Sequence, residues 1–153
     1  MERLELKLPP ALLLVVAALA IRGVAMLTPW AQFALPGRFW IAIALIAAGI
    51  ATAALGAIEF RRHRTTVDPV HPDKASALVP SGVFRISRNP MYLGFLLVLL
   101  GGVAWTANAM TLLPVIAFVL YLRRFQILPE ERWMQRRFGD AFSDYCRRTR
   151  RWV

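Results

Sequence analysis

The chain has few charged residues, a single cysteine and none of the common motifs of soluble cofactor enzymes. Charged residues make up 18% of its 153 positions and hydrophobic residues 58%, against about 25% and roughly 45–50% in soluble domains. One cysteine excludes an internal disulfide framework, and the apolar content excludes an intrinsically disordered chain. There is no G-x-G-x-x-G, P-loop or H-E-x-x-H motif, so the sites that these motifs build are not indicated.

Metal ligands and catalytic nucleophiles are equally sparse. The two histidines, His63 and His71, lie eight positions apart without a group of cysteines or carboxylates to join them, so we expect no metal site. No serine lies in a G-x-S-x-G elbow, and nucleophilic catalysis is therefore not indicated.

The charge that is present is mostly positive. Nineteen Lys and Arg against nine Asp and Glu give a net charge of +10. In a chain with a mean hydropathy of +0.49, this excess indicates basic loops against an anionic membrane surface rather than nucleic-acid binding. We therefore expect an integral membrane protein whose residues 1–153 form one domain.

Four apolar segments approach the length of about 20 residues that a membrane helix needs. They predict an all-α protein with spans at about 8–27, 39–58, 91–104 and 109–126. The last two form a tight hairpin, because residues 105–108 combine an interfacial tryptophan with polar turn residues. The small residues along 39–58 indicate close packing between helices.

The distribution of positive charge predicts the orientation. Four spans place both termini on one side, and 17 of the 19 Lys and Arg residues lie in segments 1–7, 60–90 and 123–153 on that side. The other two, Arg22 and Arg38, flank the first loop on the opposite side. By the positive-inside rule, we expect both termini in the cytoplasm and the chain in a bacterial inner membrane.

Two of the predicted cytoplasmic segments have sequence patterns too specific for simple connections between helices. The long loop 60–89 is punctuated by Pro and Gly and predicts an ordered lid. The tail 129–146 predicts an amphipathic helix lying in the membrane interface, broken near Gly139 and begun by Pro129, Glu130 and Glu131. We assign the arginines of segment 147–151 to lipid headgroups, and a helix of this kind can also be a mere anchor.

Both segments carry motifs of a known family. Residues 78–94 read L-V-P-S-G-V-F-R-I-S-R-N-P-M-Y-L-G. This stretch resembles the isoprenylcysteine carboxyl methyltransferase and phospholipid methyltransferase family of membrane enzymes, whose pattern is approximately L-V-x-x-G-P-Y-R-x-x-R-[HN]-P-x-Y-x-G. A second family pattern follows the hairpin in Glu130-Glu131, Met134, Phe138-Gly139, Phe142, Tyr145 and Arg151-Trp152. The resemblance covers about residues 75–153.

The sequence departs from the family pattern at a few positions. Val83-Phe84 replaces Pro-Tyr, which reads as a packing change, and Asn89 replaces a common histidine. Because an asparagine side chain does not titrate, proton transfer at that position is doubtful, although Asn89 can still donate and accept hydrogen bonds.

The resemblance implies S-adenosylmethionine as cofactor and a lipophilic methyl acceptor. Methyl transfer is a direct displacement that depends on alignment more than on a nucleophilic residue. No catalytic residue is assigned, and the candidates are Tyr92, Arg123 and Glu130. The expected cofactor-binding residues are Gly82, Arg88, Asn89, Pro90, Tyr92, Gly94, Glu130 and Glu131.

Three acceptor types fit this interpretation: a phospholipid amine, a prenylcysteine-like carboxylate or another small lipophile. Two other functions stay open. One is an NADPH-dependent membrane reductase, for which 153 residues are few, and the other is a non-catalytic membrane scaffold whose basic tail binds lipid. The sequence does not predict an oligomeric state.

Overall fold

The structure is a computed structural model that describes residues 5–63 and 78–153, and the chain is helical in both ranges. Its helices are α1 (Pro10–Leu27), α2 (Arg38–Arg62), α3 (Pro90–Thr106), α4 (Leu112–Leu122) and α5 (Leu128–Arg148). Short 3-10 turns form η2 (Pro29–Ala31), η4 (Gly82–Arg85) and η5 (Ala109–Thr111), and a π-helical turn forms η6 (Arg123–Ile127). Within the described ranges there is no strand, only one isolated bridge between Gln32 and Asn108. The predicted all-α class is confirmed.

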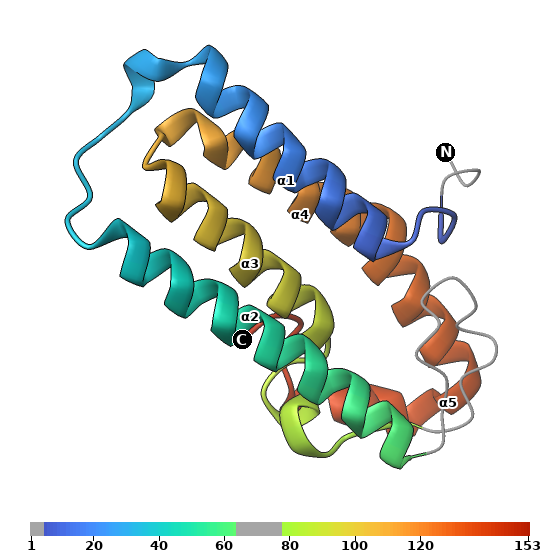
Figure 1. Ribbon diagram of the computed structural model, residues 1–153. Helices are drawn as coiled ribbons and strands as arrows, with labels where there is room; N and C mark the ends of the chain where they lie inside the picture. The colour runs from blue at the N-terminus through green and yellow to red at the C-terminus, as the bar shows by residue number, and fades with distance from the viewer. Residues whose placement is uncertain (1–4, 64–77) are drawn as a thin grey trace.

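Helix α3 occupies the middle of the bundle. Figure 1 shows α2 along one side of it and the pair α1 and α4 along the other. Between α1, α3 and α4 lies the apolar core, whose buried members include Ile21, Leu99, Phe118 and Leu122.

Small residues bring α2 and α3 unusually close. A Cβ atom added to Gly49 would lie 2.5 Å from the Gly94 carbonyl oxygen, and one added to Gly94 would lie 2.5 Å from the Gly49 oxygen. Neither position has room for a side chain. The small residues that predicted close packing therefore hold the backbones of α2 and α3 in contact.

Three helical stretches are long and apolar enough to cross a membrane, judged by length and composition: Pro10–Leu27, Arg38–Arg62 and the continuous stretch Ala109–Arg148. Helix α3 is apolar but has 17 residues, at the lower limit for a span. Large apolar side chains on the outer faces are exposed, as in Leu19, Ile50 and Ile116. These features are those of a membrane protein, and the count of four spans stays a prediction.

The connections between the helices differ in part from expectation. Helix α2 continues to Arg62, so the predicted lid loop begins later than residue 60, and residues 64–77 of that loop lie outside the described part of the chain. The turn predicted at 105–108 is present. Helix α3 ends at Thr106, Ala107 adopts a positive φ of 46°, and the Asn108 side chain accepts a hydrogen bond from the Met110 N–H at 2.9 Å.

The tail helix does not start afresh at residue 129, as the sequence suggested. Helices α4 and α5 are joined through the π-turn η6, so Pro129 lies within a continuous helical stretch rather than at its beginning. The predicted break at Gly139 is confirmed, since this residue has φ 51° and ψ −123° inside α5. The prediction failed at Pro129 because proline suits the first turn of a helix, and a π-turn also accommodates it.

Candidate functional site

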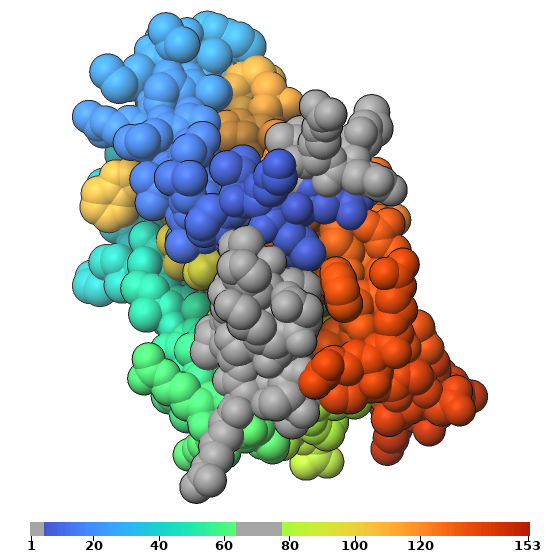
Figure 2. Space-filling model, turned by 90° about the vertical axis from the view of Figure 1, so that its right-hand side faces the viewer, coloured from blue at the N-terminus to red at the C-terminus, as the bar shows by residue number. Residues whose placement is uncertain are grey.

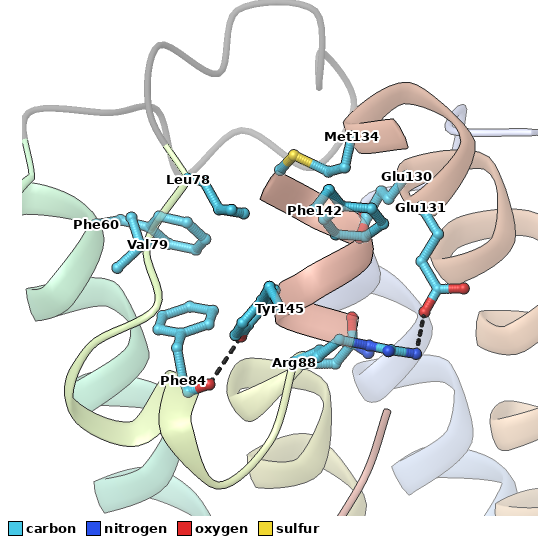
Figure 3. Close-up of a pocket in the computed structure, with 11 residues that line it drawn as sticks. Phe60, Leu78, Val79, Phe84, Arg88, Glu130, Glu131, Met134, Phe142 and Tyr145 are labelled. Carbon is cyan, nitrogen blue, oxygen red and sulfur yellow. Dashed lines mark hydrogen bonds and ion pairs between the residues drawn. The ribbon is translucent and has the colours of Figure 1, made fainter. Parts of the chain in front are cut away.

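A pocket opens where the end of α2, the loop 78–89 and helix α5 meet (Figure 3). Its cavity volume is about 90 Å³, which is smaller than the roughly 300–1,000 Å³ of most small-molecule sites. One wall is apolar, built from Phe60, Leu78, Val79, Phe84, Met134, Phe142 and Tyr145. The other wall is polar, built from Arg88, Asn89, Glu130 and Glu131.

Hydrogen bonds fix the loop 78–89 to the helices on either side of it. The Glu59 carboxylate at the end of α2 accepts bonds from Ser81 at 2.7 Å and from Arg62 at 3.1 Å. Gly82, at φ 55°, lies so close that an added Cβ would stand 2.6 Å from the Glu59 Cδ atom. On the other side, the Tyr145 hydroxyl donates to the Phe84 carbonyl at 2.7 Å. The loop is thereby fixed to both α2 and α5.

Glu131 lies between two arginines. Its Oε1 accepts from Arg88 Nη2 at 2.9 Å, and Arg151 binds both of its oxygens, at 3.0 and 2.6 Å. Arg88 also donates from Nη1 to the carbonyls of Cys146 and Thr149. The Nε atom of Arg88 is buried and has no hydrogen-bond partner among the described residues. Because an unpaired buried donor is costly, a side-chain shift that brings an acceptor to this N–H would be favourable.

Glu130 points to a different neighbour, the buried Tyr92 of α3. The Tyr92 hydroxyl donates to Glu130 Oε1 at 2.5 Å. Burial raises the pKa of the Glu130 carboxyl to about 8, although the Tyr92 hydrogen bond acts in the opposite direction; the charge of Glu131 adds to the rise. Glu130 therefore titrates near neutral pH, in a position that also borders the pocket.

The predicted site residues fall into three groups. Arg88, Asn89, Glu130 and Glu131 line the pocket, and Tyr92 reaches it through its bond to Glu130. Gly82 lies behind the loop against Glu59, and Pro90 is the buried first residue of α3.

The remaining two residues lie elsewhere. Gly94 is at the contact of α2 with α3, and the exposed Arg123 begins the π-turn. Neither is among the residues that line the pocket.

Several residues that shape the site were not predicted to belong to it. Met134, Phe142 and Tyr145 form the apolar side of α5, which we had assigned to the membrane interface, yet they line the pocket and the last two are buried. Their place in the second family pattern was one available signal, and their three- and four-residue spacing was the other. The spacing fits a membrane surface and a pocket wall equally well.

Arg151 requires a correction. We had assigned it to lipid headgroups, but its guanidinium pairs with Glu131. Its segment also returns beneath the loop: the Arg88 N–H donates to the Arg150 carbonyl at 3.0 Å, and Asn89 Nδ2 donates to the Arg151 carbonyl at 2.9 Å. The end of the chain thus holds Arg88, Asn89 and Glu131 of the polar wall in place. In the part of the chain that the structure describes, no three His, Cys, Asp or Glu residues gather as a metal site would require.

Comparison with known proteins gives the class of this fold and site. The chain matches the phospholipid methyltransferase family over residues 37–141, more than half of its length, and it belongs to that family. Proteins from two subspecies of Oryza sativa, indica and japonica, each named probable protein-S-isoprenylcysteine O-methyltransferase, are 26% identical over 113 residues. The match covers 72% of this chain but only 58% of each rice protein.

A bacterial relative is more similar over a shorter stretch. An uncharacterized protein of Haemophilus influenzae is 41% identical over 63 residues, which is 41% of this chain and all of the relative. No solved structure matches the chain.

Proposed function

We propose that this protein is a membrane methyltransferase that transfers a methyl group from S-adenosylmethionine to a lipophilic acceptor, with the cofactor bound in the pocket beside α5. The observation that carries the proposal is that one pocket combines an apolar wall with the side chains of Arg88 and Glu130. The Nε atom of Arg88 is buried and has no hydrogen-bond partner among the described residues. Membership of the phospholipid methyltransferase family supports the reaction class.

The residues of the pocket fit the parts of the cofactor. S-adenosylmethionine has a flat aromatic base, a carboxylate, an ammonium and a sulfonium. Phe60, Phe84 and Phe142 offer apolar surface for the base. The free N–H of Arg88 suits the carboxylate. Glu130 suits the ammonium, since its only partner among the described side chains is a neutral hydroxyl.

When bound, the cofactor supplies an activated methyl group, and the chain's own residues bind, orient and exclude water. Tyr92 fixes the Glu130 carboxyl by its hydrogen bond, and Glu131 keeps Arg88 in place against the polar wall. Because Glu130 has a pKa of about 8, it holds or releases a proton at its carboxyl near neutral pH. The wall of Leu78, Val79 and Met134 keeps water from that side of the pocket.

The acceptor is proposed to enter from the bilayer, because the pocket borders helices with exposed apolar faces. A phospholipid amine fits the family's name, and a prenylcysteine carboxylate fits the name of the rice relatives. The proposal includes one domain over residues 1–153, a cytoplasmic site and a bacterial inner-membrane location. The last two rest on the distribution of Lys and Arg.

The test is a transfer assay with methyl-labelled S-adenosylmethionine and the purified full chain. Vesicles containing phosphatidylethanolamine and detergent-dispersed prenylcysteine serve as the two acceptors. We expect label in one of the extracted lipids, and a strong loss of that label with Glu130→Gln but not with the exposed Arg148→Ala. Oxidation of NADPH instead of transfer would identify a reductase. Binding of neither cofactor would indicate a scaffold and contradict the proposal.

A further inference from the structure

Residues 5–8, which we call the N-terminal clasp, contact the junction of α4 and α5 at several points. In Figure 2 the dark-blue N-terminal residues lie beside the orange-red helix. The Leu6 N–H donates to the Phe125 carbonyl at 3.0 Å. The fully buried Gln126 donates from Nε2 to the Leu8 carbonyl at 2.6 Å. The clasp thus binds backbone and side chain of the π-turn η6.

The clasp is also held by charge. Glu5 accepts from Arg124 in the π-turn at 2.8 Å and from Arg132, two helical turns further on, at 2.5 Å. The hydrogen bond from Arg124 is the main cause of a lowered pKa at Glu5, followed in the same direction by the charge of Arg132. Glu5 therefore bridges the two ends of the junction as a carboxylate.

The reason for these contacts lies in Pro129. In a regular helix, residue 129 donates its N–H to the carbonyl four positions earlier, at Phe125. Proline has no N–H, so that carbonyl is left without its helical partner, and the Leu6 N–H occupies it. The π-turn itself also departs from regular helical bonding. Leu128 donates its N–H to the Arg123 carbonyl, five positions earlier, so the turn holds one residue more than an α-helical turn.

That additional residue sets which glutamate meets which partner. If η6 relaxed to α-helical bonding, every later residue would advance by one position, about 100° of rotation and 1.5 Å of rise. Pro129 would then stand opposite Tyr92, where Glu130 now accepts its hydrogen bond. Glu130 would take the place of Glu131 between Arg88 and Arg151.

We propose that the N-terminal clasp holds the π-turn and thereby keeps Glu130 and Glu131 in register with Tyr92 and Arg88. Glu5 and Gln126 are positioning residues in this account, since neither lines the pocket. The inference rests on the proposed function only where ligand binding is the readout. Its structural part stands on the contacts of the clasp alone.

The sharpest test compares Arg124→Ala with deletion of Arg124, because both remove the same side chain and only the deletion shortens the turn. After deletion, Leu128 lies four positions from Arg123, so a regular helix keeps the two glutamates in place. We expect Arg124→Ala and Glu5→Gln to weaken S-adenosylmethionine binding by about three- to tenfold. We expect the deletion, alone or combined with Glu5→Gln, to bind like the parent chain.

Leu6 offers a second matched pair that tests the backbone contact. Leu6 has a positive φ of 57°, which glycine adopts without strain. Leu6→Gly keeps the N–H and should behave like the parent. Leu6→Pro removes the donor and also cannot adopt this φ, so it should displace the clasp and weaken binding at least as much as Glu5→Gln.

Amide hydrogen exchange over residues 124–134, in detergent and without ligand, gives a readout independent of the proposed function. We expect faster exchange in Glu5→Gln, Arg124→Ala and Leu6→Pro, and parent-like exchange in Leu6→Gly and in the deletion variant. Parent-like exchange in Glu5→Gln, or a deletion variant as impaired as Arg124→Ala, would overturn the clasp. Absence of S-adenosylmethionine binding in the parent would instead contradict the proposed function, and the exchange data would still decide the clasp.

Discussion

The Tyr92 hydroxyl lies 2.5 Å from Oε1 of Glu130, although 38 positions separate the two residues in the chain. The next residue, Glu131, makes its bonds with Arg88 and Arg151 instead. Adjacent residues of one helix point about 100° apart, so the two glutamates of the polar wall meet different partners. We therefore expect the two carboxylates to have different roles: Glu130 binds a ligand, and Glu131 stabilises the fold.

Substitution of the two glutamates should separate these roles. Glu131→Gln removes the charge that pairs Arg88 with Arg151 and should lower the free energy of unfolding by about 1.5–3 kcal/mol. Glu130→Gln keeps an oxygen for the Tyr92 hydroxyl and should leave stability unchanged or raised at neutral pH. Thermal unfolding of both variants in detergent checks this. Equal destabilisation by the two substitutions would contradict the assignment of Glu131 to stability and of Glu130 to ligand binding.

The pKa of Glu130 predicts a pH dependence of stability. The folded value of about 8 lies above the ordinary 4.5, so the folded chain keeps a proton that the unfolded chain has already released. The stabilisation is complete below about pH 4.5 and is lost as the pH rises through about 8. Unfolding followed from pH 5 to 9 should show this decline in the parent. Glu130→Gln should lose less stability over the same range.

The affinity for S-adenosylmethionine should change with pH in the opposite direction to the stability. A cation beside Glu130 favours the ionised carboxylate, so binding of S-adenosylmethionine must release the proton that Glu130 holds below pH 8. Between about pH 6 and 7.5 we expect the affinity to rise by up to about tenfold per pH unit. In Glu130→Gln the affinity should change by less than about twofold over that interval. Titrations in two buffers of different ionisation enthalpy would detect the released proton.

The contact between α2 and α3 provides a prediction about packing. Gly94→Ala places a methyl group 2.5 Å from the Gly49 carbonyl oxygen, so the helices must separate, at a cost of about 1–3 kcal/mol. Gly23→Ala in α1 is the matched control, because nothing lies within 4 Å of its added Cβ. If thermal unfolding of the two variants shifts alike, the close contact of α2 and α3 is wrong.

The orientation of the chain is tested by reporter fusions. Because all but two of the Lys and Arg residues lie on one predicted side, a fusion after Val153 should report the cytoplasm and one within residues 30–36 the opposite side. A signal from outside the cytoplasm at Val153 would contradict the orientation, and the same side for both fusions would contradict the even number of spans.

Local signals predicted much of this fold, and tertiary contacts account for most of what they missed. Asn108 at the turn and Gly139 at the break are residue types that favour these conformations. The positive φ of Ala107 is one that alanine does not favour. The continuity of α4 with α5 was missed because the Phe125 carbonyl that Pro129 leaves free is filled by Leu6, more than 100 positions away.

The candidate site, like the fold, was predicted where local sequence signals were present and missed where tertiary contacts decide. The pocket residues Arg88, Glu130 and Glu131 were predicted through the family motifs. Arg151 also belongs to the second family pattern, but it was assigned to lipid headgroups, because its ion pair with Glu131 depends on where the end of the chain returns. The apolar face of α5 was assigned to the membrane, since periodicity reveals an apolar face but not what covers it.

The most direct measurement is a calorimetric titration of S-adenosylmethionine into the detergent-purified parent, Glu130→Gln, Tyr92→Phe and Arg148→Ala, each first shown to be folded. At pH 7.5, the account predicts saturable binding to the parent, and equal binding to Arg148→Ala, whose side chain is exposed. It predicts binding about ten- to hundredfold weaker for Glu130→Gln, as expected for a lost charge-assisted contact, and weaker binding for Tyr92→Phe. Parent-like affinity in both Glu130→Gln and Tyr92→Phe would place the cofactor outside this pocket and contradict the account.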